Sequence, residues 1–218
     1  MACTPSPLLY LFFILIISSG IGKGLVTTYL AVPNTTVVAT VRDPSHPTAQ
    51  SLYSLPKASG SSLIIITLDV SSTNSIESGI KSLISAHNID VLDVVIANAG
   101  MAEMSGRLTI SPVSELQTFV NTNAYGQFEL FKAVAPLLRA SKVESKGKFV
   151  LISSAGGSLT TMNVILPLAA YGASKALANF LIKWLALENE DLVIWAQHPG
   201  YVYLFSNPTL QLLRRNCC

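Results

Sequence analysis

Short apolar runs alternate with longer segments in which apolar and polar residues recur at helical spacing, from residue 8 almost to the end of the 218-residue chain. Such alternation is typical of repeated βαβ units. The apolar runs predict six strands, at residues 8–17, 36–41, 63–68, 91–97, 148–152 and 192–196. Helices are predicted after the first strand up to residue 30, and at residues 71–85, 113–140 and 171–187. Residues 42–62 are predicted to be mostly loop, with a short helix near 49–55.

Because strand–helix–strand crossovers are right-handed and place helices on both faces, this order predicts a single α/β domain with a doubly wound parallel sheet. Half of the residues are hydrophobic and only 12% are charged, against about 25% in a typical soluble domain. The low charge fits a sheet buried on both faces. A net charge of +2 without a basic cluster argues against a nucleic-acid partner.

The three cysteines, Cys3, Cys217 and Cys218, all lie at the chain ends. They form neither a disulfide framework nor a metal-ligand spacing, so a reducing, cytoplasmic location without a metal site is predicted. The apolar run at residues 8–17 is half the ~20 residues that a membrane-spanning helix needs. No Lys or Arg precedes it, unlike in a secretory signal. A buried strand is favoured, and a signal or membrane anchor stays the alternative.

Tyr171 and Lys175 are the residues that most directly indicate chemistry. Four residues apart on a predicted helix, their side chains share one face. The Lys175 ammonium is expected to favour the phenolate and to lower the tyrosine pKa from its usual value near 10. Such a tyrosine can donate a proton to a carbonyl oxygen or remove one from an alcohol. Ser154, at the end of the preceding strand, can hydrogen-bond the same oxygen. The spacing alone is common, and Ser154 can equally cap its loop.

Several other polar or glycine residues also follow predicted strands, at the carboxyl edge where parallel sheets bind ligands. In chain order these are Gly20, Asp69, Asn98, Ser154 and Pro199-Gly200. Their repeated position predicts a small-molecule site along that edge.

Seven motifs in this order and spacing resemble the short-chain dehydrogenase/reductase family over residues 8–202. They are Ser18-Ser19-Gly20-Ile21-Gly22, Asp69-Val70, Asn98-Ala99-Gly100, Asn123-x-x-Gly126, Ser153-Ser154, Tyr171-x-x-x-Lys175 and Pro199-Gly200. The resemblance implies a Rossmann fold and an oxidoreductase that acts on a carbonyl or alcohol substrate with a nicotinamide cofactor.

The resemblance also implies a role for each matching residue. Tyr171 would be the acid/base, and Lys175 would lower its pKa and bind the nicotinamide ribose. Ser154 would position the substrate oxygen, and Asn123 would hold a water in the proton relay. The cofactor would be bound by Ser19, Gly20, Ile21, Gly22, Asp69 (at the adenine), Asn98 and Val202 (at the carboxamide), besides Tyr171 and Lys175.

The residue about 20 positions past the glycine turn distinguishes the two nicotinamide cofactors: an acidic residue binds the ribose 2′-hydroxyl and Arg accommodates a 2′-phosphate. Here Arg42 occupies that position, directly after the second predicted strand, and Asp43 follows it. We therefore favour NADP(H), with NAD(H) as the alternative.

The chain departs from the family pattern in two places. Where the family's glycine loop begins Thr-Gly, this chain has Leu15 and Ile16. An Ile side chain there would crowd the phosphates, so weakened cofactor affinity is expected. Residues 203–218 do not follow the family's pattern, which predicts that the last strand and the lid over the substrate are missing. Residues 1–7 are expected to form a tail, and a homo-oligomer stays open.

Two functional hypotheses follow. The Val-Arg-Asp-Pro turn and the long insert between Ser154 and Tyr171 are similar to fungal ketoreductases of the norsolorinic-acid-reductase kind. This similarity suggests an NADP(H)-dependent ketoreductase of aromatic polyketide secondary metabolism. The alternative is a truncated, catalytically impaired relative that retains the fold as a binding or vestigial protein.

Overall fold

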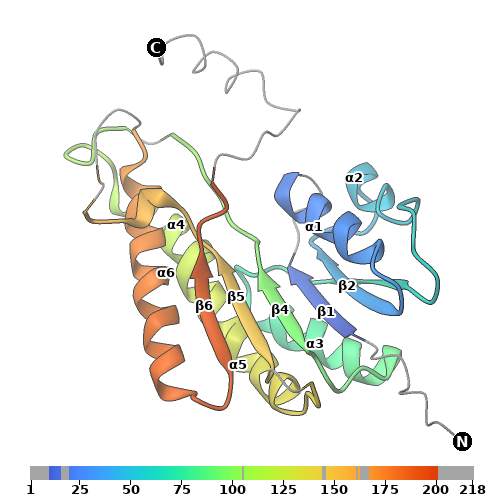
Figure 1. Cartoon of the computed structure of the whole chain (residues 1–218). Coiled ribbons are helices and arrows are strands. Elements are labelled where there is room, and N and C mark those ends of the chain that lie inside the picture. Colours follow the sequence, from blue (N-terminus) through green and yellow to red (C-terminus); the bar gives the residue numbers. More distant parts are fainter. Residues whose placement is uncertain are drawn as a thin grey trace, which may run out of the picture.

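The computed structural model describes residues 10–15, 20–104, 106–143, 146–160, 162 and 167–200. Its centre is a six-stranded sheet in the order β3-β2-β1-β4-β5-β6 (Figure 1). Every neighbouring pair is parallel, which confirms the predicted doubly wound sheet. The strands are β1 (Tyr10–Leu15), β2 (Thr35–Val41), β3 (Ser62–Thr67), β4 (Val94–Ala97), β5 (Lys148–Ile152) and β6 (Val193–Gln197).

The apolar run near the N-terminus contributes β1, one of the two central strands of this sheet. Tyr10 pairs with Thr35 of β2, and Phe12 pairs with both Val37 of β2 and Val94 of β4. The prediction of a strand in residues 8–17 is therefore confirmed for residues 10–15. Among the residues that the structure describes, no helix combines the length and the apolar character that a membrane crossing needs.

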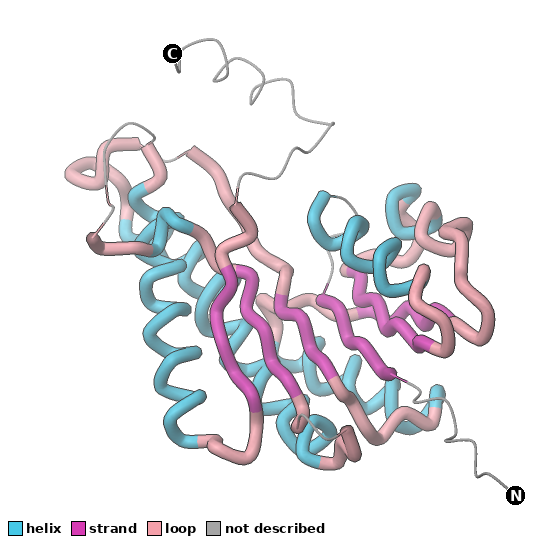
Figure 2. Tube along the Cα trace, viewed as in Figure 1, coloured by secondary structure: helices cyan, strands magenta, loops and turns pink. Residues whose placement is uncertain are grey.

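Helices cover both faces of the sheet (Figure 2). The helical segments are α1 (Gly20–Leu30), α2 (Pro47–Gln50), α3 (Thr73–His87), α4 (Val113–Val120), the π-helix η1 (Asn121–Tyr125), α5 (Gly126–Arg139), the 3₁₀-helix η2 (Ala155–Gly157) and α6 (Ala169–Glu188). One core contains Val26 of α1 with Val37 and Ala39 of β2. The other packs α3, α5 and α6 against strand residues that include Val38 and Phe149. Alternate residues of β2 thus enter opposite cores, as expected of a sheet buried on both faces.

The helix predicted at residues 113–140 is interrupted in the structure. Five residues of π-helix separate α4 from α5, and such wide turns are frequent at functional sites. Gly126 begins α5 directly after this turn. A Cβ atom there would overlap the carbonyl oxygen of Val70 and lie 2.9 Å from its Cγ2. The first residue of α5 therefore packs directly against the backbone of the segment that follows β3.

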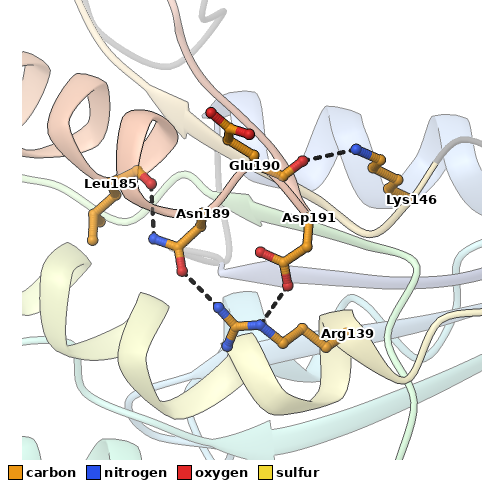
Figure 3. A network of polar contacts seen from close by, with 6 residues as sticks. All are labelled: Arg139, Lys146, Leu185, Asn189, Glu190 and Asp191. Carbon is orange, nitrogen blue, oxygen red and sulfur yellow. Dashed lines mark hydrogen bonds and ion pairs between the residues drawn. The ribbon is translucent and has the colours of Figure 1, made fainter.

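A polar network joins the C-terminal end of α5 to the turn between α6 and β6 (Figure 3). Arg139 Nε donates to Asp191 Oδ2, and Arg139 Nη2 donates to Asn189 Oδ1, both at 2.6 Å. Lys146 Nζ donates to the carbonyl oxygen of Glu190 at 2.7 Å. These residues lie where β5 and β6 begin. The network therefore connects segments at the amino ends of these strands, opposite the carboxyl ends where the site is predicted.

Residues 201–218 lie outside the described part of the chain. The prediction that the last strand and the lid are missing falls on that segment, as does the predicted contact of Val202. Ser19 and Ile16 also lie outside the described residues, and with them the predicted crowding of the glycine loop.

Candidate active site

Ser154, Tyr171 and Lys175 meet where β5 ends and α6 begins. Ser154 follows β5 and caps η2, its Oγ accepting from the Gly156 backbone N–H at 3.1 Å. The Ser154 side chain also hydrogen-bonds the phenol of Tyr171. The Lys175 ammonium lies 5.9 Å from the centroid of the Tyr171 ring and donates to the carbonyl oxygen of Ile152 at 2.8 Å. The sequence-predicted trio is thus brought together.

Close backbone packing holds this trio in place. A Cβ atom at Gly157 would lie 2.8 Å from the carbonyl carbon of Lys175 and 2.9 Å from its Cβ. Real Cβ atoms do not approach other atoms that closely, so η2 can contact α6 here only because residue 157 is glycine. The position of Ser154 relative to Tyr171 is set by this contact.

Burial shifts the pKa values of Tyr171 and Lys175 in opposite directions. Loss of solvent raises the pKa of Tyr171, and the hydrogen bond from Ser154 opposes this shift. Burial lowers the pKa of Lys175 from 10.5 to about 8. The prediction of a lowered tyrosine pKa is therefore wrong for this structure. The Lys175 ammonium donates to Ile152, and the desolvation of the phenol is the larger effect on Tyr171. Tyr171 is protonated at neutral pH and can act as a proton donor.

Asn123 lies in the π-helix η1, fully buried, and connects three segments. Its Nδ2 donates to the carbonyl oxygen of Met101 and to Ser174 Oγ, and its Oδ1 accepts from the Met101 N–H, each at 2.9 Å. Both side-chain N–H groups are therefore occupied. A water held by Asn123, as the family resemblance implies, would have to donate to one of its carbonyl oxygens; this role stays a prediction.

The sequence reasoning missed two further residues at this site. Ser174 Oγ accepts from Asn123 and donates to the carbonyl oxygen of Tyr171 at 2.6 Å. Gln127, almost fully buried on α5, donates through Nε2 to the carbonyl oxygens of Ala99 at 2.7 Å and Thr122 at 3.2 Å. Gln127 could have been predicted from the sequence, because it is a polar residue on the apolar face of a predicted helix.

The loop after β4 runs close to these groups. Asn98 and Gly100 are half-buried, and Gln127 holds the intervening Ala99. A Cβ atom at Gly100 would lie 3.0 Å from Asn123 Oδ1 and 3.6 Å from Lys175 Nζ. A glycine at residue 100 therefore keeps open the space beside Lys175.

The other half of the predicted site lies at the carboxyl ends of β1, β2 and β3. Gly20 begins α1 with φ of 63°, a conformation that favours glycine, and Gly22, in the first turn of the helix, is buried. Ile21, between them, is half-buried. The N-terminus of α1 carries the partial positive charge that suits phosphate groups.

Arg42 and Asp69 complete this half. Arg42 is exposed directly after β2. Asp69 follows β3, and its Oδ1 accepts from the Ser71 N–H at 2.9 Å and from Ser71 Oγ at 2.7 Å. Because β1 and β4 are neighbours, the two halves adjoin at the point where the strand order reverses, which is where such sheets bind dinucleotides. The described residues fit that class of ligand.

A family model described as short chain dehydrogenase matches residues 13–206. The chain belongs to the short-chain dehydrogenase family. The resemblance carried by the seven motifs is thereby confirmed, and the protein is an oxidoreductase of a family that uses nicotinamide cofactors.

Several curated relatives of this short-chain dehydrogenase come from fungi. The short chain dehydrogenase gsfK of Penicillium aethiopicum is 60% identical over 183 residues, which cover 84% of this chain and 72% of gsfK. The norsolorinic acid ketoreductase nor1 of Dothistroma septosporum is 39% identical over 187 residues, covering 85% of this chain and 69% of nor1. The norsolorinic acid ketoreductase of Aspergillus parasiticus is 36% identical over 187 residues, with 85% and 68% covered.

Solved structures share the fold of this short-chain dehydrogenase. The NADPH-bound carbonyl reductase from chicken fatty liver has a TM-score of 0.79 and 27% identity, and the match covers 88% of this chain and 79% of that one. The carbonyl reductase Sniffer of D. melanogaster has a TM-score of 0.78 and 25% identity, with 88% and 81% covered.

Proposed function

We propose that this short-chain dehydrogenase is an NADP(H)-dependent ketoreductase that converts a ketone to a secondary alcohol. The observation that carries the proposal is the joining of Ser154, a protonated Tyr171 and a buried Lys175 at the carboxyl edge of the sheet. This arrangement places a proton donor and a second hydroxyl where one carbonyl oxygen can contact both.

Tyr171 would act as the general acid of the reduction. When bound, the nicotinamide cofactor supplies a hydride to the carbonyl carbon. The oxygen of the former carbonyl takes the Tyr171 proton, so one C–H and one O–H bond form as the C=O π bond breaks. Ser154 would hold that oxygen by a hydrogen bond. Lys175, with its pKa lowered to about 8 by burial, would bind the ribose beside the nicotinamide and return a proton toward Tyr171.

The remaining predicted residues would bind the cofactor. Ser19, Gly20, Ile21 and Gly22, with the N-terminus of α1, would hold the pyrophosphate. Asp69 would border the adenine, and Asn98 would support the sheet beside the nicotinamide. Val202 would contact the carboxamide.

NADP(H) is favoured over NAD(H) because Arg42 is an exposed cation directly after β2, where a 2′-phosphate would lie. Among the described residues, Arg42 has no ion pair that would engage its guanidinium. The chicken carbonyl reductase, 27% identical, has NADPH bound. Each of these observations supports the same cofactor.

The substrate is proposed to be an apolar ketone, such as an aromatic polyketide of fungal secondary metabolism. Two relatives at 39% and 36% identity are norsolorinic acid ketoreductases. The loops that leave β4 and β5 beside Tyr171 also expose large apolar side chains, which would suit an apolar ring system. They are Met104, Leu108, Ile110, Leu159 and Met162, all more than half exposed.

Fluorescence titration of the purified protein with NADPH and NADH tests the proposal. NADPH is expected to bind about tenfold or more tightly, because Arg42 pairs with the 2′-phosphate. Arg42→Ala should remove most of that preference, whereas Arg107→Ala, an exposed arginine in the loop after β4, should retain it. If neither cofactor binds at millimolar concentration, the proposal is wrong. The protein would then be the impaired relative suggested by Ile16, which stands where the family usually has a glycine.

A further inference from the structure

The residue after Arg42 is an aspartate, which in the same loop would be expected to favour NAD(H). The structure shows what occupies its carboxylate. Asp43 Oδ1 accepts two hydrogen bonds from one residue, from the Ser45 backbone N–H at 2.8 Å and from Ser45 Oγ at 2.6 Å. The pKa of Asp43 is lowered mainly by these Ser45 bonds, so the carboxylate is ionised at neutral pH.

The loop that carries Asp43 is also tied to the short helix α2. The His46 N–H donates to the carbonyl oxygen of Asp43 at 3.3 Å. The His46 ring caps α2 by accepting from the Thr48 N–H, and Gln50 Nε2 donates to the carbonyl oxygen of Pro44 at 2.6 Å. The backbone from residue 43 to residue 46 is therefore held in one conformation, and with it the position of Ser45.

We propose that Ser45 is a positioning residue for cofactor selection, which holds the Asp43 carboxylate in its own loop so that Arg42 alone meets the 2′ position of the adenosine ribose. This inference rests on the proposed NADP(H)-dependent function. A carboxylate that binds a ribose 2′,3′-diol uses its oxygens as acceptors, and Asp43 Oδ1 already accepts two bonds. A carboxylate turned toward the ribose would also repel a 2′-phosphate.

Without the Ser45 hydrogen bonds, Arg42 would favour a 2′-phosphate and the adjacent Asp43 would favour a 2′-hydroxyl at the same position of the ribose. Arg42 is free to pair with a 2′-phosphate while Asp43 is turned toward Ser45. Removing the Ser45 hydroxyl leaves the carboxylate with backbone N–H donors alone, that of Ser45 and, with a smaller effect on the Asp43 pKa, that of His46. The side chain can then turn to accept from a ribose 2′-hydroxyl, and it weakens the phosphate binding of Arg42. Asp43 is thus a latent determinant for NAD(H).

The test is a double-mutant cycle on Ser45 and Asp43 that measures binding and not turnover. Wild type, Ser45→Ala, Asp43→Asn and the double variant are titrated with NADPH and NADH, and with 2′,5′-ADP and 5′-AMP as probes without a nicotinamide. Ser45→Ala should lower the preference for the 2′-phosphorylated ligands by about fivefold, the effect of one hydrogen bond. The double variant should keep the preference of Asp43→Asn, because no carboxylate remains to be released.

Two further variants separate positioning from general loop stability. Ser45→Thr retains the hydroxyl and should keep the wild-type preference. Thr48→Ala removes a hydroxyl of the adjoining helix α2 that contacts the His46 ring, and this variant should also keep the wild-type preference. Circular dichroism and the unfolding temperature establish that each variant is folded.

The outcomes distinguish this inference from the proposed function. If wild type binds NADPH but Ser45→Ala leaves the preference unchanged, Ser45 does not position Asp43 and the proposed function stands. The inference is also overturned if Thr48→Ala has the same effect as Ser45→Ala, or if the shift persists in the double variant. If wild type binds no nicotinamide cofactor, both proposals are wrong.

Discussion

Lys175 and Tyr171 lie one helical turn apart on α6, and burial disfavours the charged form of each. Electrostatic attraction between an ammonium and a phenolate would have favoured both charges. Burial prevails because the Lys175 ammonium donates to the carbonyl oxygen of Ile152 and the phenol is largely removed from water. The site therefore favours a neutral tyrosine, the form that can donate a proton.

This lowered lysine pKa predicts a measurable dependence of stability on pH. Between about 8 and 10.5 the unfolded chain binds a proton at Lys175 that the folded protein does not bind, so this residue makes the free energy of unfolding rise with pH. From pH 8 to pH 9.5 the free energy of unfolding of wild type should gain about 1.5 kcal/mol relative to Lys175→Met. Urea unfolding of the cofactor-free proteins at both pH values measures the difference.

Lys183→Met, which replaces an exposed lysine on the same helix, is the matched control and should follow the wild-type pH dependence. A constant difference between wild type and Lys175→Met across this pH range would show that the Lys175 pKa is not lowered by burial.

The sequence predicted the Tyr171–Lys175 pair from helical spacing and Ser154 from its place after a strand. It could not predict the direction of the tyrosine shift, because that depends on burial and on a contact to Ile152, 23 residues earlier in the chain. Ser174 and Gln127 were missed for a related reason. Ser174 meets Asn123 through the packing of α6 against η1, and Gln127 meets Ala99 through the packing of α5 against the loop after β4.

At the scale of elements, the apolar runs predicted the positions of the strands. The start of one strand and the interruption of one helix depended on tertiary contacts instead. The strand predicted from residue 91 begins at Val94, because the Leu92 N–H donates to the carbonyl oxygen of Leu137 on α5 rather than to a neighbouring strand. The helix predicted at residues 113–140 contains a π-helical turn. The apolar spacing of this segment is compatible with a continuous α-helix and with a helix that contains a π-helical turn. The buried hydrogen bonds of Asn123 stabilise the π-helical turn, and these cannot be read from the spacing.

The contact of α5 with the segment after β3 predicts that Gly126→Ala is strongly destabilising. The added methyl group would overlap the Val70 backbone, which cannot move aside as a side-chain end can. The free energy of unfolding should fall by about 2 kcal/mol or more. Gly24→Ala is the matched control, because a Cβ there meets nothing within 4 Å and alanine stabilises a helix by about 0.5–1 kcal/mol. Equal unfolding free energies for the two variants in urea would contradict the predicted packing.

At the scale of the whole molecule, the parallel sheet brings the carboxyl ends of all six strands to one edge. Gly20, Arg42 and Asp69 lie over β1–β3, and Ser154 and Tyr171 lie over the other half. This division was predictable, because each motif follows a strand and the strand order of such sheets is restricted. The amino ends of β5 and β6 carry the Arg139 network (Figure 3), away from the candidate site.

In the proposed function, Tyr171 donates the proton in an NADPH-dependent reduction. The most direct measurement is the oxidation of NADPH by wild type and Tyr171→Phe, with and without a panel of aryl alkyl ketones, with Tyr53→Phe as an exposed control. Ketone-dependent oxidation should occur in wild type and Tyr53→Phe. It should fall by about 10²–10⁴-fold in Tyr171→Phe, while NADPH binding is retained. Turnover by Tyr171→Phe at the wild-type rate would contradict the claim.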